Sequence, residues 1–279
     1  MGTTVTIEVV RADADEVVDR AFGWFHAVED TCTRFDTRSE LMQLTSHVGV
    51  PTAASPILYQ AIQFALHVAE DSGGAFDPTI GHRMETRGFN REHRTGAGVH
   101  TAGITDDDVS YRDVQVDPDG QTITLTRPLV LDLGAVAKGL AVDLAARELQ
   151  PFTDFAIDAG GDLYLGGHRA NGEEWSVGIR HPRTPGIVID SLRVSNAAVC
   201  TSGDYERGRH VLDPRTGEPA RSVASATVIA PSAMLGDALA TAAFVLGPAD
   251  GIAFLERHGV EGLIVTPRLE RHATSGWRT

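Results

Sequence analysis

The sequence has 279 residues, and its 38 acidic and 24 basic side chains give a formal net charge of −14. Hydrophobic residues make up 42% of the chain, enough for a sizeable core, which argues against wholesale disorder. The acidic surface argues against a nucleic-acid or membrane-surface binder, because it repels phosphate backbones and anionic lipids.

The first half of the chain shows patterns typical of strands, helices and loops. A strand alternates apolar and polar residues, a helix has apolar residues three and four positions apart, and a loop has few apolar residues. By these criteria we predict, in chain order, a strand over 5–10, helices over 13–30 and 56–70, a mobile loop over 81–110 and a β-hairpin over 111–128. The motifs on either side of the loop belong together, so the loop is interpreted as part of one domain.

The second half of the chain predicts short strands among helices. In chain order these are a helix over 137–149, strands over 155–158, 162–165, 175–180, 187–195 and 223–230, helices over 234–246 and 249–258, and a last strand over 263–265. Strands and helices do not alternate regularly, which favours an α+β fold over a doubly wound parallel sheet. We therefore predict a single α+β domain of mixed strands and helices over residues 1–279.

The cysteines and the N-terminal segment bear on the compartment. Cys32 and Cys200 are far apart and outside any C-x-x-C spacing, so they are interpreted as partly buried thiols rather than a disulfide framework or a zinc site. No apolar run reaches the ~18 residues that span a membrane. The opening MGTTVTIEVV lacks the basic region of a signal peptide. A cytoplasmic protein is expected, with a trimmed form of an exported protein as the alternative.

The segment LDLGAVAKGLAVD, residues 131–143, suits an anionic ligand. The basic residues of the chain are 23 arginines and one lysine, Lys138, which lies in this segment. The segment runs through Gly134 into a helix, whose first amides can bind a phosphate, and Lys138 would add a positive charge beside them. It is not a Walker loop, because the G-x-x-x-x-G-K-[ST] spacing is absent.

The segment GDALATAA suits a divalent cation. Asp237 and Thr241 lie four residues apart, on one face of a predicted helix. Two such hard oxygens, joined by a carbonyl from another segment, suit Mg²⁺ or Ca²⁺ better than zinc. The residues leave open that Asp237 caps the helix and Thr241 packs within it. His210 in HVLDPRTG and Asp77 in FDPT are likewise compatible with purely structural roles.

The order of the motifs is more informative than any one of them. From residue 1 to about 265 they are MGTTVTI, CTRFDTRSEL, GGAFDPTIG, LDLGAVAKGLAVD, AGGDLYLGG, WSVGIRHP, TSGDYERG, HVLDPRTGEP and DALATAAFVLG. In this order they closely resemble the ApbE family, whose members are flavin transferases that move FMN from FAD onto a Ser or Thr of an acceptor protein. The resemblance implies an ApbE-like, T-fold-related architecture.

The resemblance also implies roles for individual residues. The residues that it places in contact with FAD are Met1, Phe35, Ala75, Phe76, Asp77, Asp132, Lys138 and Val211. The implied metal ligands are the backbone carbonyl of Ala135 and the side chains of Asp237 and Thr241, with Mg²⁺ expected and Ca²⁺ as the alternative. His210 is implied as the acid/base.

Three functions are weighed on this basis. The first is a Mg²⁺-dependent FAD:protein FMN transferase, with FAD as substrate, an acceptor protein as partner and AMP as product. The second is an FAD pyrophosphatase that uses the same site with water as nucleophile and releases FMN and AMP. The third is a flavin-binding protein without turnover. The joint presence of His210, Asp237 and Thr241 argues against the third, because a pure binder does not need all three.

Overall fold

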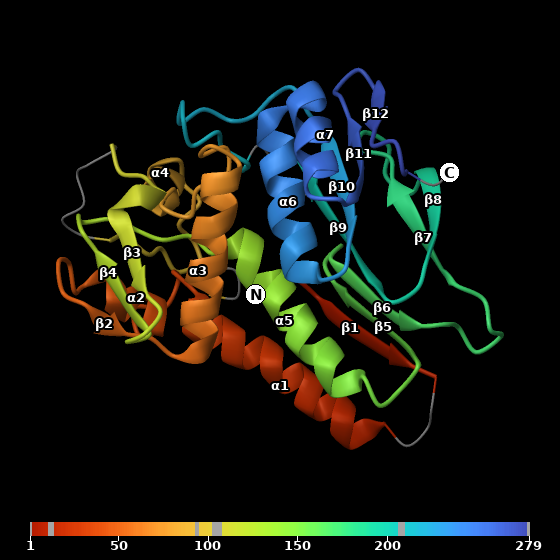
Figure 1. Cartoon of the computed structure of the whole chain (residues 1–279), viewed down its shortest axis with the longest axis horizontal. Helices are drawn as coiled ribbons and strands as arrows, with labels where there is room; N and C mark the ends of the chain where they lie inside the picture. The colour runs from red at the N-terminus through yellow and green to blue at the C-terminus, as the bar shows by residue number, and fades with distance from the viewer. Residues whose placement is uncertain (1, 11–13, 93–94, 102–107, 206–209, 278–279) are drawn as a thin grey trace.

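The computed structural model describes residues 2–10, 14–92, 95–101, 108–205 and 210–277. The strands of its largest sheet are β1 (Val5–Val9), β5 (Asp154–Ala159), β6 (Leu163–Gly167), β9 (Ala197–Gly203), β10 (Ser225–Ala230), β11 (Glu261–Val265) and β12 (Arg271–Ala273). Within the described ranges they pair in the order β1-β5-β6-β9-β10-β11-β12, and each neighbouring pair is antiparallel (Figure 1). The N-terminal strand therefore lies beside a strand from the middle of the chain.

Two further sheets complete the strands of the described residues. One joins β2 (Thr52–Ala53), β4 (Thr122–Leu125) and β3 (Val114–Asp117) in that order. The other is the hairpin of β7 (Trp175–Arg180) and β8 (Val188–Val194). The predicted hairpin over 111–128 is confirmed, because β3 and β4 pair antiparallel across the expected turn.

The helices begin either at a serine cap or at a residue that makes no side-chain cap hydrogen bond. They are α1 (Asp15–Cys32), α2 (Glu40–Thr45), α3 (Pro56–Asp71), α4 (Gly81–Thr86), α5 (Gly134–Leu149), α6 (Ala233–Leu246) and α7 (Pro248–Arg257), with a 3₁₀ turn at Tyr111–Asp113. The Ser55 hydroxyl accepts a hydrogen bond from the Leu58 amide at 3.3 Å, and Pro56 follows it at the first helical position. Ser232 caps α6 in the same way, by accepting from Leu235.

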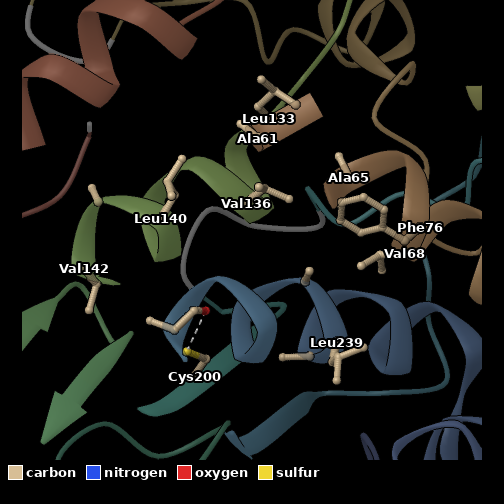
Figure 2. Close-up of a cluster of buried hydrophobic side chains, with 14 of the residues drawn as sticks. Ala61, Ala65, Val68, Phe76, Leu133, Val136, Leu140, Val142, Cys200 and Leu239 are labelled. Atoms are coloured by element: carbon tan, nitrogen blue, oxygen red, sulfur yellow. Dashed lines mark hydrogen bonds between the residues drawn. The ribbon is translucent and has the colours of Figure 1, made fainter. Parts of the chain in front are cut away.

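The large sheet is covered on both faces. In β9, Ala198 and Cys200 belong to the core on the helix side, whereas Val199 between them belongs to a second cluster with Trp175 and Leu192 of the β7–β8 hairpin. This alternation follows from the two-residue period of a strand. Figure 2 shows part of the helix-side core, where side chains of α5 and α6 meet those of α3.

Helices α5 and α6 cross at short distance because residue 139 is a glycine. A Cβ added to Gly139 would lie 2.5 Å from both the carbonyl oxygen of Ala233 and the Cα of Met234. One turn further along α5, the Asp143 carboxylate accepts hydrogen bonds from the amides of Ala233 (2.6 Å) and Met234 (3.0 Å). Burial raises the pKa of Asp143 despite these two amide donors. The start of α6 is thereby fastened to α5.

Most predicted elements are confirmed, with small shifts at their ends. Strand β7 coincides with the predicted 175–180. Helix α5 begins at Gly134, earlier than the predicted 137. Its cap residue, Leu133, makes no side-chain cap hydrogen bond, and the Gly134 amide donates to Asp132 Oδ1 at 2.8 Å. Strand β9 was not predicted, since its small residues, buried on both faces, show no alternation of apolar and polar residues.

The predicted loop over 81–110 is partly helical. Helix α4 occupies Gly81–Thr86, and an antiparallel bridge joins Arg91 to Gly98. Residues 93–94 and 102–107 lie outside the described residues, so the mobility of this segment stays a prediction.

Both cysteines are buried and unpaired, as expected. Burial, followed by the charge of Glu40, raises the pKa of the Cys32 thiol from 9.0 to about 12, and burial raises the pKa of Cys200 well above its usual range. The thiolate is the reactive form. We therefore expect iodoacetamide to modify neither thiol of the native protein at neutral pH and both after unfolding, as measured by mass spectrometry.

The raised pKa of Cys32 makes the stability of the fold depend on pH in the alkaline range. The folded state favours the protonated Cys32 thiol, so the stability that this thiol contributes is present below pH 9 and is lost as the pH rises toward 12. Rapid alkylation of either cysteine in the folded protein would contradict its burial.

Candidate functional site

The single lysine of the chain lies between two buried carboxylates. Lys138 Nζ lies 3.2 Å from Asp237 Oδ2 and also forms an ion pair with Asp162 Oδ2. The side chains of Asp162, Asp237 and Lys138 are 1%, 8% and 21% exposed. Two carboxylates and one ammonium leave one negative charge in excess. Away from water this charge attracts a cation more strongly than it would at the surface.

Three separate elements bring these side chains together. Lys138 lies in the second turn of α5, and Asp237 lies near the start of α6, which the Gly139 crossing holds against α5. Asp162 comes from the turn between β5 and β6, where Gly160 and Gly161 adopt φ of +66° and +98°. Glycine adopts such angles without strain, so the turn can direct Asp162 toward α5.

Two hydroxyl groups pair with each other one helical turn along α6 from Asp237. Thr241 lies one helical turn after Asp237, and its Oγ1 is 3.0 Å from the Ser202 Oγ of β9. The expectation that Asp237 and Thr241 share a helix face is met, since both lie within α6 at i and i+4. The alternative that Asp237 caps this helix is wrong, because the cap is Ser232.

The oxygens of this cluster suit a hard divalent cation. Apart from their ion pairs with Lys138, the buried Asp162 Oδ2 and Asp237 Oδ2 have no hydrogen-bond partner among the described residues, and buried polar atoms ordinarily have one. The part of the chain that the structure describes holds no group of three or more His, Cys, Asp and Glu side chains arranged around a metal. Hydroxyl and carbonyl oxygens would therefore complete the coordination, and Thr241 and Ala135, one turn before Lys138, can supply them.

A second cluster forms around Arg34 at the start of α5. The buried guanidinium donates to Asp132 Oδ2 at 2.6 Å and to the carbonyl oxygen of Phe89, and it lies 4.2 Å from the centre of the Phe35 ring. Arg34 thus joins Phe35 and Asp132, two of the predicted FAD contacts. Phe35 in CTRFDTR is one of the predicted site residues, whereas Arg34 beside it is not.

Asp132 changes the expectation for the first turn of α5. That helix start was expected to offer its amides to a phosphate, but the Gly134 amide already donates to Asp132 Oδ1. The Asp132 amide in turn donates to the carbonyl oxygen of Pro78 at 2.7 Å, which ties the GGAFDPTIG segment to α5. A phosphate at this end of α5 would therefore share the site with a carboxylate that faces Arg34.

Asp77 and its neighbours lie inside the fold. Asp77 Oδ1 accepts from the amide and hydroxyl of Thr79 at 2.9 and 2.7 Å, and Oδ2 accepts from the Tyr111 amide at 3.0 Å. Burial raises the pKa of Asp77 despite these donors. Ala75 and Phe76 are buried, and Figure 2 shows Phe76 among core side chains such as Val68. The structure does not bring the Asp77 carboxylate into the Lys138 cluster.

His210 and Val211 open a separate hairpin. The Ala220 amide donates to the Val211 carbonyl at 3.0 Å, and Leu212 bridges to Pro219. Helix α4 holds this hairpin, because Arg83 donates to the carbonyl oxygen of Pro214 and Arg87 forms an ion pair with Glu218 at 2.9 Å. His210 and Val211 are half-buried. Met1, the remaining predicted FAD contact, and residues 206–209 before His210 lie outside the described residues.

Known proteins are similar to this chain in sequence and in fold. The sequence profile of the ApbE family matches residues 1–264. An FAD:protein FMN transferase of Treponema pallidum is 33% identical over 271 residues, which cover 85% of this chain and 74% of that protein. One of Vibrio cholerae is 28% identical over 288 residues, which cover 95% of this chain and 85% of that protein.

Solved structures agree with the predicted fold class. The flavin transferase ApbE from Vibrio cholerae superposes with a TM-score of 0.86 at 26% identity, over 99% of this chain and 94% of that one. The ApbE protein from Thermotoga maritima superposes with a TM-score of 0.85 at 28% identity, over 98% of this chain and 94% of that one. The prediction of a single α+β domain with an ApbE-like architecture is confirmed.

Proposed function

This chain belongs to the ApbE family, and on that premise we propose that it is an FAD:protein FMN transferase that uses Mg²⁺ to move FMN from FAD onto a Ser or Thr hydroxyl of an acceptor protein. The observation that carries the proposal is the cluster in which buried Asp162 and Asp237 surround Lys138 next to Thr241. Anionic oxygens for a divalent cation and an ammonium for a phosphate are what the transfer of a pyrophosphate-linked group requires.

In this proposal the implied metal ligands and Lys138 each have a task. Asp237, Thr241 and the Ala135 carbonyl would hold Mg²⁺, or Ca²⁺ as the alternative. The bound ion would neutralise charge on the pyrophosphate and on the departing AMP. Lys138 would bind a phosphate oxygen as a compact point charge.

The transfer step itself would use His210. An imidazole nitrogen of His210 would take the proton of the acceptor hydroxyl. The hydroxyl oxygen then forms a bond to the FMN phosphorus. The bond from that phosphorus to the bridging oxygen breaks, and AMP leaves with the electron pair.

The FAD contacts are proposed in two groups. Phe35 and Asp132 are supported by their shared contact with Arg34. Ala75, Phe76 and Asp77 are buried, so we propose that they shape the flavin site through the turn they form rather than through exposed side chains. Met1 and Val211 remain proposed contacts on the resemblance alone.

A reaction with a candidate acceptor tests the proposal. The protein is incubated with FAD, Mg²⁺ and an acceptor encoded beside it that carries a Ser or Thr in a flavinylation-type motif, and the acceptor is then weighed by mass spectrometry. The expected result is a mass gain of one FMN group with an equal amount of AMP. Free FMN and AMP without a mass gain would establish the pyrophosphatase instead, and bound FAD without AMP would establish a silent binder.

We expect His210→Ala to slow flavin transfer by about 100-fold, the lower end of what a positioned general base contributes. FAD affinity should stay near the wild-type value, because the proposed task of the imidazole is proton transfer. The rate is followed by the flavin fluorescence of the acceptor. His26→Ala, which removes an exposed histidine of α1, serves as the control. An unchanged rate in the His210 variant would remove this residue from the mechanism.

None of the described helices is both long and apolar enough to cross a bilayer. The cytoplasmic location stays a prediction from the sequence.

A further inference from the structure

We propose that Asp162 is a positioning residue of this site, which holds the Lys138 ammonium and so keeps Asp237 available for a divalent cation. The inference rests on the proposed function, in which Asp237 is a metal ligand and Lys138 binds a phosphate. Neither the motif-based assignment of roles nor the transfer step gives Asp162 a task. Yet its side chain is only 1% exposed, and its Oδ2 faces Lys138.

The three charged side chains of the cluster do not balance. Asp162 and Asp237 share one ammonium, so neither carboxylate is neutralised by a cation of its own. Without the Asp162 charge, Lys138 would pair with Asp237 alone. A metal ion would then have to displace a complete buried ion pair before it could bind Asp237, and it would bring two positive charges beside an ammonium that has no other partner.

The turn between β5 and β6 holds the Asp162 side chain in place. Asp162 sits in a turn whose backbone is fixed by two hydrogen bonds, from the Gly161 amide to Asp158 Oδ1 and from the Ala159 amide to the Asp162 carbonyl, both 2.9 Å long. A Cβ on Gly160 would lie 1.9 Å from Thr3 Oγ1, so the N-terminal segment packs against the same turn. Asp162 is therefore held in place, whereas Lys138 has four rotatable methylenes and can shift between partners.

Asp162 comes from a different segment of the chain than Asp237 and Thr241, the proposed metal ligands on α6. Thr241 lies one helical turn from Asp237 on α6, and its hydroxyl is paired with that of Ser202 on β9. Asp162 belongs to another element and faces the lysine. Its effect on the affinity for a cation would thus pass through Lys138. Substitution of Asp162 with and without Lys138 measures this indirect effect.

The experiment is a double-mutant cycle on the full chain without FAD. Mn²⁺ is titrated into the protein, and the EPR signal of the free ion reports its binding. Asp162→Asn is expected to weaken Mn²⁺ binding about tenfold, a coupling typical of residues in one ion-pair network. Asp158→Asn, an exposed carboxylate of the same turn whose hydrogen bond an amide oxygen can keep, is the matched control and should change binding by less than about twofold.

The same pair of substitutions is then made in a Lys138→Met background. If Asp162 acts mainly through the lysine, Asp162→Asn should now weaken binding clearly less than tenfold, because only the through-space attraction of its charge is then lost. An equal loss in both backgrounds would show that Asp162 ligates the ion directly and would overturn the inference. No loss in the parent background, or no Mn²⁺ binding by the wild type, would overturn it as well. Asp162→Glu, which keeps the charge, should recover most of the affinity and shows that an effect of Asp162→Asn is not a folding defect.

The proposed function and the proposed role of Asp162 can be refuted independently of each other. A wild-type protein that binds Mn²⁺ with the expected dependence on Asp162 but transfers no flavin would refute the proposed function and leave the role of Asp162 standing. A protein that transfers flavin while Asp162→Asn binds Mn²⁺ as the wild type does would refute this inference alone.

Discussion

Asp237→Asn is expected to reduce AMP release and flavin transfer by about 1,000-fold or more, since a catalytic metal supplies several kcal/mol of charge stabilisation in the transition state. The same substitution should leave the metal-free protein at least as stable as the wild type. In the wild type two buried carboxylates compete for Lys138, and the variant leaves one carboxylate, Asp162, with one ammonium. Function and stability should therefore change independently.

Activity and melting temperature are measured on the same preparations of each protein. AMP release and transfer are assayed at saturating FAD with Mg²⁺, and melting temperatures are compared in EDTA and in Mg²⁺. Mg²⁺ should raise the melting temperature of the wild type and leave that of the variant unchanged, because only the former binds the ion. Asp250→Asn, an exposed carboxylate in the first turn of α7, is the control. AMP release at the wild-type rate in Asp237→Asn would show that the metal assignment is wrong.

Lys138→Met should change stability in the opposite direction. Methionine keeps the length of the side chain and removes its charge, which leaves two buried carboxylates without a cation. Breaking a buried ion pair by removing one partner costs about 3–5 kcal/mol, so the free energy of unfolding in EDTA should fall by about that amount. Mg²⁺ should restore part of the loss, because it replaces the missing positive charge.

Urea unfolding with and without Mg²⁺ measures this effect. Arg20→Met is the matched control, since it removes one positive charge from an exposed pair with Glu148 on the helix surface, a loss of at most about 1 kcal/mol. The double variant Lys138→Met with Asp237→Asn should be more stable than Lys138→Met alone, because one unpaired carboxylate then remains instead of two. Equal midpoints for Lys138→Met and the wild type in EDTA would contradict the buried cluster.

Lys138→Met should also weaken FAD binding. The proposed contact is an ammonium with a pyrophosphate, and methionine offers that anion no charge. Binding is measured by the quenching of flavin fluorescence in Mg²⁺, where the variant is expected to be folded. Phe22→Tyr lies in α1, which contributes no residue to this cluster, and serves as the control. Equal affinities in the two variants would count against the phosphate role of Lys138.

The local sequence predicted most of the helices and strands, and it also predicted contacts between residues of one helix. The spacing of apolar residues predicts α3, α6 and the β3–β4 hairpin, because helices and hairpins are built from hydrogen bonds between near neighbours. The pairing of Asp237 with Thr241 on one helix face follows from the same local geometry. The ordered motifs, which span nearly the whole chain, predict the family and with it the fold class.

The local sequence did not predict which residues the side chains of the site contact. Arg34 and Asp132 are 98 positions apart, and Ser202 and Thr241 are 39 positions apart. With 38 acidic residues in the chain, nothing local marks Asp162 as the one that faces Lys138. The motif AGGD shows a glycine turn followed by a carboxylate, and the direction of that carboxylate depends on how β5 and β6 lie against α5.

The sequence by itself thus determined the family, the α+β class, the main helices and strands and a short set of candidate residues. The tertiary structure alone decided that Lys138 is shared by Asp162 and Asp237, that Asp132 occupies the start of α5 and faces Arg34, and that Phe76 lies in the core. The physical reason is that helix and hairpin patterns repeat over a few residues. The balance of charge at a buried site depends instead on side chains from distant segments, which meet only when α5, α6 and the sheet pack together.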